Sequence, residues 1–270
     1  MPPEPTTKRI AVINQKGGVG KTTTAVSLAA DLAMRGYNVL FLDLDSQGNA
    51  STALGVDRYA DDLPTAHDLL FGESTPVPMA LGEFAPALLV GTIDLVRADV
   101  ALLAHGDARD KVLEARLAAL SGDWDFIILD SPPSLGLLTV NILQAATHVI
   151  VPVQCEYLAL EGLTMLRETV GEMSRGRALP LHMLGVLITM ADLRTNLSQQ
   201  VVADLRAHLL DEVFRTMIPR TIRLSECPSH GQTIFQYDRW GAGARCYEAL
   251  TTEVLERLDM PTSKHRKEVR

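Results

Sequence analysis

The sequence contains little of what marks secreted or membrane-spanning proteins. Its three cysteines, Cys155, Cys227 and Cys246, have neither disulfide nor metal-ligand spacing, so we expect free thiols in a reducing cytoplasm. The longest apolar runs, such as FIIL and HVIVPV, are short and β-rich and predict buried strands rather than membrane spans. Residues 1–7 form a short polar lead without signal-peptide features, and no repeat or low-complexity tract follows.

An excess of positive charge is also missing. Lys and Arg number 25 against 33 Asp and Glu, a net charge of -8. This excludes a protein that is basic over its whole surface, although nucleic acid can still bind a local patch. The basic tail KHRKEVR, residues 264–270, has no apolar face, and we interpret it as a solvated end. Of the 270 residues, 47% are hydrophobic, which predicts one large domain with a sizeable core.

Strand-like and helix-like segments alternate along the chain, which predicts a mostly parallel sheet covered by helices. We expect strands at 9–14, 39–43, 93–97, 126–130, 148–153, 183–189 and 213–218. We expect helices at 22–35, 108–120, 137–145, 160–174, 197–209 and 242–258, with Gly36 capping the first. The segment 57–86 is richer in Pro, Gly and acidic residues and is expected to be a surface excursion with one short helix.

The segment KGGVGKTTT has the composition of a phosphate-binding loop. Gly20, Lys21 and Thr22 match the end of G-x-x-x-x-G-K-T, whereas Gln15 or Lys16 replaces its first glycine. Glycines let backbone N–H groups turn toward a polyphosphate, the lysine charges its β and γ oxygens, and the threonine offers a hydroxyl to Mg²⁺. A strand-like segment before and a helical one after place a helix N-terminus at the phosphates. The predicted nucleotide-binding residues are Lys16, Gly17, Gly18, Val19, Gly20, Lys21, Thr22 and Thr23.

Carboxylates follow two of the predicted strands. FIILDSPPS places Asp130 at the end of an apolar strand, where a parallel sheet binds its ligands, and we expect it to hold Mg²⁺ directly or through water. A simple cap into the next loop is the alternative. FLDLDSQGNAS places Asp43 and Asp45 on one face of an extended segment; on its own, this segment is also compatible with an acidic turn.

Four motifs in order resemble the ParA/MinD superfamily of dimerising ATPases. K-G-G-x-G-K-[ST] resembles its deviant Walker A motif, and D-x-D-x-Q-G-N resembles the ParA-type partition proteins. MADLRTNLSQQV and IPRTIRLSECPSHGQTI resemble segments of the Soj branch. The resemblance extends from Arg9 to about Leu258. It implies a single-domain α/β P-loop NTPase with a twisted, mostly parallel sheet and helices on both faces, comprising residues 8–260 between the lead and a tail at 261–270.

The resemblance also implies roles for residues near the nucleotide. Lys16 would reach the nucleotide of the facing subunit. Asp45 would orient the attacking water, and Asp43 would support the Mg²⁺ shell. Gln47 and Asn49 would belong to a switch that senses the γ-phosphate.

In the distal half, Arg194 and Arg223 match the arginines that contact DNA in the family. Pro219 and Thr221 align with the adenine pocket. Thr221 stands where the family usually has Asn, and its shorter side chain puts a direct adenine contact in doubt. The stretch LVRADVALLAHGDARDKVLEARL also departs from the family pattern, which affects only local surface detail.

The implied protein is a weak ATPase that uses ATP and Mg²⁺ and forms a homodimer with ATP. The dimer would bind non-specific double-stranded DNA, and a ParB-type centromere-binding protein would stimulate hydrolysis in partitioning of a chromosome or plasmid. We expect it in the cytoplasm, associated with the nucleoid and not bound to a membrane. A MinD-like membrane ATPase is the alternative, which Pro261 and the tail disfavour. The chain lacks the paired cysteines that a nitrogenase-like iron protein needs, and a dethiobiotin-synthetase relative does not explain the distal motifs.

Overall fold

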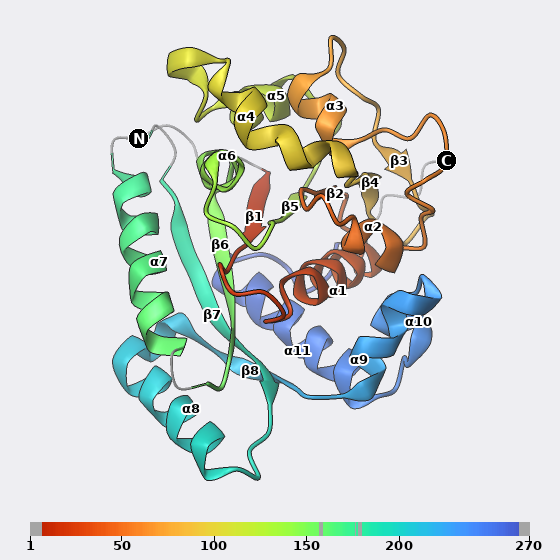
Figure 1. Cartoon of the computed structure of the whole chain (residues 1–270). Coiled ribbons are helices and arrows are strands. Elements are labelled where there is room, and N and C mark those ends of the chain that lie inside the picture. The colour runs from red at the N-terminus through yellow and green to blue at the C-terminus, as the bar shows by residue number, and fades with distance from the viewer. Residues whose placement is uncertain (1–6, 157–158, 176, 178–179, 265–270) are drawn as a thin grey trace.

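The computed structural model describes residues 7–156, 159–175, 177 and 180–264. In this part of the chain, one sheet has the strand order β3-β4-β2-β5-β1-β6-β7-β8, with β3 antiparallel to β4 and all other neighbours parallel (Figure 1). The strands are β1 Lys8–Val12, β2 Val39–Asp43, β3 Met79–Ala80, β4 Ala87–Leu89, β5 Phe126–Asp130, β6 His148–Gln154, β7 His182–Ala191 and β8 Val213–Pro219.

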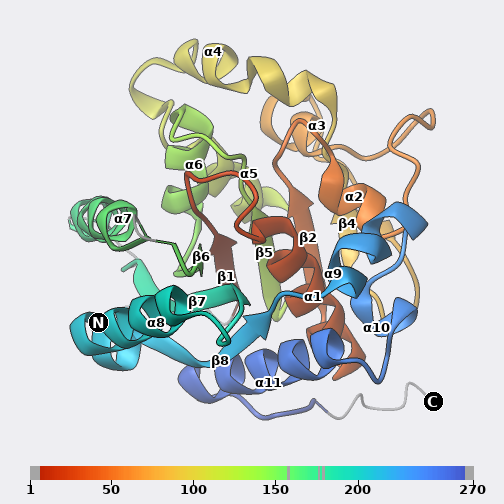
Figure 2. The ribbon, with the colours of Figure 1, turned by 60° about the horizontal axis from the view of Figure 1, so that its bottom comes forward.

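Helices connect the strands and cover both faces of the sheet (Figure 2). Along β1, Ile10 and Val12 face one apolar core with α1 and α11, whereas Ala11 faces a second core with α3 to α8. The two-residue period of a strand produces this alternation. The longer helices are α1 Lys21–Met34, α5 Val112–Ala119, α6 Leu137–Ala145, α7 Ala159–Ser174, α8 Asn196–Leu209 and α11 Ala242–Arg257.

Shorter helices lie at the edges of these layers. They are α2 Asn49–Ala53, α3 Ala66–Phe71, α4 Ala98–Leu103, α9 Ile222–Glu226 and α10 Ile234–Tyr237, with 3₁₀ turns η1 Ile93–Arg97, η2 Gly106–Ala108, η3 Leu210–Glu212 and η4 Cys227–His230. No helix within the described residues is both long and apolar enough to cross a bilayer. The expected α/β fold is therefore confirmed, with a mostly parallel sheet and helices on both faces.

One sequence prediction about this edge of the sheet was wrong, and a second placed the start of a helix too early. Residues 93–97 form η1 rather than a strand, because Leu95 is their only buried side chain; the strand beside β2 is β4, at 87–89. The helix expected at 108–120 begins at Val112, and α4 precedes it. The expected excursion at 57–86 does contain one short helix, α3, but it also carries β3.

Glu253 ties α11 to β8 from a nearly buried position. Its carboxylate accepts the backbone N–H groups of Arg215, at 2.8 Å, and Thr216, at 3.0 Å, and Arg257 donates to it at 3.0 Å. Burial raises the pKa of this carboxyl, but these hydrogen bonds outweigh burial and bring the pKa below its ordinary value. The ionised carboxylate is therefore the form that holds the two elements together.

We expect Glu253→Gln to lower the free energy of unfolding by about 1.5–3 kcal/mol at pH 7, because an amide cannot accept all three donors. The pKa of this carboxyl in the unfolded chain is near 4.3. Its pKa in the folded protein lies below that value. The loss should therefore be complete above that pH and shrink as the pH falls through the folded pKa. Urea unfolding at pH 7 and at pH 3.5 measures both values, with the exposed Glu256→Gln as control. An equal loss at both pH values would contradict an ionic role.

Candidate nucleotide-binding site

The loop between β1 and α1 has the backbone shape of a phosphate cradle. Gly18 and Gly20 have φ angles of 75° and 85°, in the left-handed region that glycine adopts without strain. Helix α1 begins directly after the loop, where the N–H of Thr24 donates to the carbonyl of Gly20 at 2.9 Å. The first amides of α1 therefore point toward the loop opening, as an anion requires.

Hydrogen bonds to the neighbouring strands β6 and β7 fix the position of this loop. The amide of Asn14 donates to the Pro152 carbonyl in β6 at 2.8 Å. Gln154 donates to the Gly18 carbonyl and Thr189, in β7, donates to the Val19 carbonyl, each at 2.8 Å. Gln154 and Thr189 were missed in the sequence, where their only signal is a polar side chain at or near the end of a strand.

Lys21 is the buried cation of the site. It is 7% exposed, and its ammonium donates to the carbonyl of Lys16 at 3.3 Å. Burial lowers its pKa, while the nearby charges of Asp130 and Asp45 raise it. The loop therefore places a partly desolvated positive charge within reach of two carboxylates.

Asp130 is a fully buried carboxylate at the end of β5. Neither of its oxygens has a hydrogen-bond partner of ordinary geometry among the described residues. Burial raises its pKa well above the ordinary value, and the charge of Asp43 raises it further, against the nearby Thr22 hydroxyl and Lys21. An unpartnered buried carboxylate is costly on its own and favours a site for a cation.

Asp43 lies beside Asp130, because the two residues are register partners on β2 and β5. Its oxygens are already engaged. Ser51 donates through its N–H at 2.8 Å and its hydroxyl at 2.7 Å, and the N–H of Asp45 donates at 3.3 Å. Burial raises the pKa of Asp43 to about 6 against these hydrogen bonds. A Cβ on Gly91 would lie 2.5 Å from the carboxyl carbon of Asp43, so this carboxylate is tightly enclosed.

The segment after Asp43 forms a compact turn. Asp45 accepts the N–H of Gln47 at 3.0 Å and is only partly buried. Gln47 and Asn49 are both exposed, and the second of these begins α2. The turn therefore presents the Asp45 side chain near Lys21 and leaves two polar side chains open to contact.

Lys16 is an exposed residue of the loop. Its side chain is 52% exposed and forms an ion pair with Glu156, beyond the end of β6. Among the described residues, the Lys21 ammonium hydrogen-bonds the backbone carbonyl of Lys16 and not its side chain. Glu156 was not identified from the sequence, because the contact joins residues far apart in the chain.

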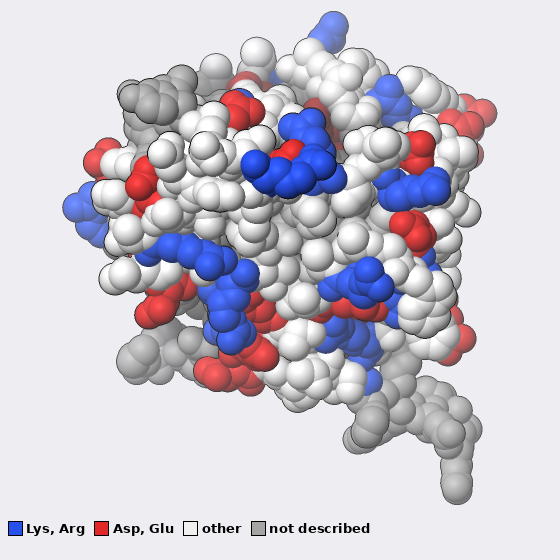
Figure 3. Space-filling view, turned by 90° about the horizontal axis from the view of Figure 1, so that it is seen from below, with Lys and Arg blue, Asp and Glu red and all other residues white. Residues whose placement is uncertain are grey.

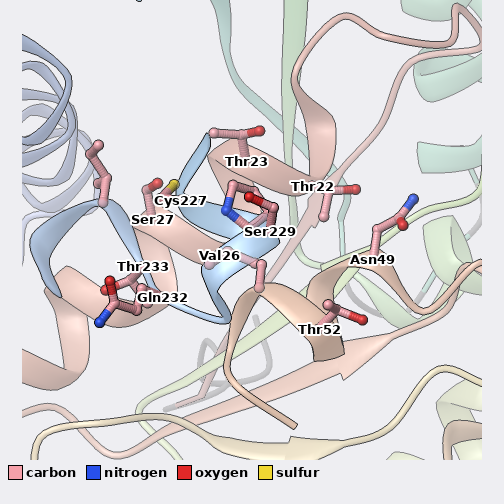
Figure 4. A pocket seen from close by; sticks show the side chains of 13 residues that line it. Thr22, Thr23, Val26, Ser27, Asn49, Thr52, Cys227, Ser229, Gln232 and Thr233 are labelled. Carbon is pink, nitrogen blue, oxygen red and sulfur yellow. The ribbon is translucent and has the colours of Figure 1, made fainter. Parts of the chain in front are cut away.

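Two cavities adjoin the first turn of α1. One, of about 290 Å³, includes Gly20, Thr23, Pro219 and Thr221 in its lining; the Thr221 hydroxyl accepts the N–H of Leu224 at 3.2 Å. The structure thus brings the predicted adenine residues to the loop, with the Thr221 oxygen engaged in capping α9. The other cavity, of about 410 Å³, lies between α1, α2 and residues 227–234, and Figure 4 shows hydroxyl and amide groups from all three around it.

The two arginines predicted to contact DNA are exposed but paired. Arg194 is 87% exposed and binds both oxygens of Asp192, each at 2.7 Å; this pairing lowers the pKa of Asp192 to about 2. Arg223 pairs with Glu226 at 3.2 Å. On the face shown in Figure 3, the described Lys and Arg residues form separate groups among Asp and Glu rather than one basic band.

Comparison with known sequences gives consistent matches. A family model described as an AAA domain matches residues 7–182. The chromosome-partitioning ATPase Soj of Treponema pallidum is 45% identical over 258 residues, covering 93% of this chain and 98% of that protein. Soj of Thermus thermophilus is 47% identical over 255 residues, covering 93% and 96%. The chromosome partitioning protein ParA of Myxococcus xanthus is 42% identical over 265 residues, covering 96% and 91%.

Solved structures share the fold. A cobyrinic acid a,c-diamide synthase from Mycobacterium smegmatis, with an ATP analogue and magnesium, is 37% identical, with a TM-score of 0.78 and coverage of 96% of this chain and 100% of that one. The septum site-determining protein MinD of Pyrococcus horikoshii, with Mg-ADP, is 25% identical, with a TM-score of 0.73 and the same coverage. From the extent and identity of the sequence matches, this chain belongs to the Soj/ParA family of chromosome-partitioning ATPases.

Proposed function

We propose that this chain is an ATPase that dimerises with ATP, binds DNA without sequence preference as the dimer, and hydrolyses ATP faster when a ParB-type protein binds. One contrast carries the proposal. Lys21 and Asp130 are buried in one site within the chain, whereas the exposed Lys16 pairs with Glu156 rather than with the site carboxylates. We assign this second cation to the nucleotide of a facing subunit.

The residues present fit ATP with Mg²⁺. The unpartnered Asp130 oxygens and the Thr22 hydroxyl are the oxygen ligands that Mg²⁺ accepts, with phosphates and water completing its shell. No group of three or more His, Cys, Asp or Glu side chains in the described residues could hold a metal alone, which agrees with a metal that arrives with the nucleotide. When bound, Mg²⁺ neutralises charge on the β and γ oxygens. Asp43 braces the turn and contributes negative charge beside the metal site.

Asp45 is proposed to orient the attacking water. It lies within electrostatic reach of Lys21, and the turn that contains it is fixed by Asp43 and by its own bond to Gln47. Gly17, Gly18, Val19, Gly20, Lys21, Thr22 and Thr23 bind the phosphates, and Pro219 and Thr221 line the base cavity. Positioning and charge supply most of the acceleration in such reactions.

ATP is proposed to drive dimerisation through Lys16. In the single chain its ammonium is neutralised by Glu156, and the γ-phosphate of a facing subunit would compete for it. A nucleotide shifts a monomer–dimer equilibrium only through contacts that one state lacks. The contact of Lys16 with a facing γ-phosphate supplies such a difference between ATP and ADP.

DNA binding is assigned to Arg194 and Arg223, and it fits a dimer better than a single chain. Each arginine already has a carboxylate partner, so one copy offers little free positive charge. Two copies double the number of phosphate contacts along one face. The proposed location is the nucleoid within the cytoplasm.

Two other functions are less well supported. A MinD-like membrane anchor needs an amphipathic C-terminal helix, but α11 ends at Arg257, before Pro261. Of the expected basic tail at 264–270, residues 265–270 lie outside the described residues. An amide synthase activity is suggested only by the name of a 37% identical structure, whereas relatives with 42–47% identity are named as partitioning proteins.

Lys21→Ala should weaken ATP binding roughly 30- to 150-fold, because the phosphates lose a charge-assisted hydrogen bond of about 2–3 kcal/mol. Isothermal calorimetry with ATP and Mg²⁺ measures the affinity. Lys111→Ala, an exposed lysine at the start of α5, is the matched control. Unchanged affinity in Lys21→Ala would reject the phosphate site.

Asp45→Ala should leave ATP binding intact, slow hydrolysis about 100-fold or more and accumulate the dimer. Asp45→Asn keeps an acceptor for the Gln47 N–H and removes only the charge, so it should be equally slow. Phosphate release and light scattering are read on both variants. An active Asp45→Asn would assign the effect to the turn.

Lys16→Ala should remain monomeric with ATP, because the proposed contact across the dimer is lost. Light scattering with ATP and with ADP measures the state of this variant and of the parent. Equal dimer formation in Lys16→Ala would contradict the cross-subunit role.

Arg194→Ala and Arg223→Ala should each weaken DNA binding and flatten its dependence on salt, while ATP-dependent dimerisation is kept. Asp192→Asn should have the opposite effect, because it frees Arg194 from its carboxylate partner. Gel shifts at several salt concentrations measure all three variants. If both alanine variants bind DNA as the parent does, the DNA surface lies elsewhere.

A further inference from the structure

The η1–α4 helix is apolar on two opposite sides. Its inner side, Leu95, Ala98 and Leu102, is at most 4% exposed and packs into the core. Its outer side carries a second apolar row at helical spacing, and the side chains of that row are 58–72% exposed: Ile93, Val96, Val100 and Leu103. A helix with apolar residues on both sides is typical of burial on both sides, and a contiguous exposed apolar row marks an interaction surface.

An acidic groove continues this row at its N-terminal end. The groove has a volume of about 550 Å³ and lies between the loop at 58–65 and residues 92–94, so that Ile93 belongs to both features. Asp61, Asp62 and Asp94 line it, and the charges are three aspartates against one arginine, Arg58. Among the described residues, none of these aspartates forms an ion pair with Lys, Arg or His.

The surface is tied to both segments that follow the site carboxylates. Arg58 donates to the carbonyl of Gln47, two residues after Asp45. The aromatic ring of Tyr59 lies beside the Arg58 guanidinium, and Tyr59 is 79% exposed. At the other end, Asp99 of α4 accepts the N–H of Leu138 at 2.7 Å, in the first turn of the helix that follows Asp130. A molecule bound across this surface would therefore contact Arg58 and Asp99, the residues that hydrogen-bond the segments after Asp45 and after Asp130.

We propose that the η1–α4 row and the adjoining groove together form a docking surface for a short cationic, amphipathic segment of a partner protein. Apolar side chains of such a segment cover Val96 and Val100, and its Lys or Arg residues pair with Asp61 and Asp62. The proposal rests on the proposed function only in naming hydrolysis as the activity that the bound segment alters.

The charge of the surface selects this occupant over two others. A second copy docked through the same face would bring the same three aspartates and one groove arginine, so it offers no excess of positive charge to pair with them. An anionic lipid surface would be repelled by the same aspartates, whereas amphipathic helices that bind membranes carry Lys and Arg on their polar face. A cationic protein segment satisfies both the apolar row and the acidic groove.

The test uses two fluorescein-labelled helical peptides of 18 residues, with leucine on one side and either lysine or glutamate on the other. Fluorescence anisotropy with the full chain should show the lysine peptide binding at least about tenfold more tightly than the glutamate peptide, with the preference lost at 0.5 M salt. Val96→Ser/Val100→Ser should weaken binding of the lysine peptide about tenfold. Asp61→Asn/Asp62→Asn should weaken it about fivefold and reduce its salt dependence.

Matched controls are Val77→Ser and Asp204→Asn, which are exposed residues away from this surface; both should bind the lysine peptide as the parent does. Equal binding of that peptide to the parent and to both double variants, or no binding to the parent, would overturn the proposal. Loss of ATP-dependent dimerisation in Val96→Ser/Val100→Ser would also overturn it, because that result would assign the face to a second copy of the chain. Parent binding to phosphatidylglycerol vesicles that the same variant loses would assign it to lipid.

The proposed function has separate readouts in the same variants. ATP-dependent dimerisation and DNA binding, measured without peptide, should be unchanged in both double variants. A failure of peptide binding with these two activities intact rejects only the docking surface. The lysine peptide should also change the rate of phosphate release by the parent and leave that of Val96→Ser/Val100→Ser unchanged. An equal change in both proteins would contradict the proposed coupling.

Discussion

The structure depends on two carboxylates buried side by side at the ends of neighbouring parallel strands. Asp43 and Asp130 are both fully buried and are register partners, so their charges repel across a medium that screens poorly. Hydrogen bonds from Ser51 and Asp45 satisfy the first carboxylate, whereas the second has no hydrogen-bond partner of ordinary geometry in the described part of the chain. Lys21 supplies one positive charge nearby, which leaves the pair short of a cation.

The surrounding backbone is arranged around that imbalance. Gly91 approaches Asp43 so closely that any side chain there would displace the carboxyl group. The donors to Asp43 come from Ser51 in α2 and from the backbone of Asp45, so the same carboxylate fixes the turn between them. A change of charge at Asp130 would therefore act on Asp45 through Asp43, by electrostatics and by hydrogen bonds. This gives the site a physical route from the nucleotide to the turn.

Much of the site could be predicted because its residues follow strands with strong apolar signals. FIILD and VLFLD identify buried strands that end in Asp130 and Asp43, and the glycine-rich loop identifies the phosphate cradle. The edge of the sheet was harder to predict. IDLVR is rich in the apolar residues that strands contain, whereas the true strand β4 has only three residues, too few to show a period. Neither α9 nor α10 was predicted, since five- and four-residue helices have no periodicity to detect.

Contacts between distant residues limited the site prediction in a different way. Glu156 meets Lys16 only after β6 is placed beside β1, so no local pattern could indicate it. Asp192 and Arg194 are two residues apart, and their pairing could have been inferred from sequence. Both contacts share one physical consequence: the cations that the family resemblance assigns to a facing subunit and to DNA are neutralised in the single chain. If those assignments hold, each interaction is an exchange of anions around an existing cation. Its net free energy is then smaller than the new contact alone suggests, which favours reversal of the proposed dimerisation and the proposed DNA binding after hydrolysis.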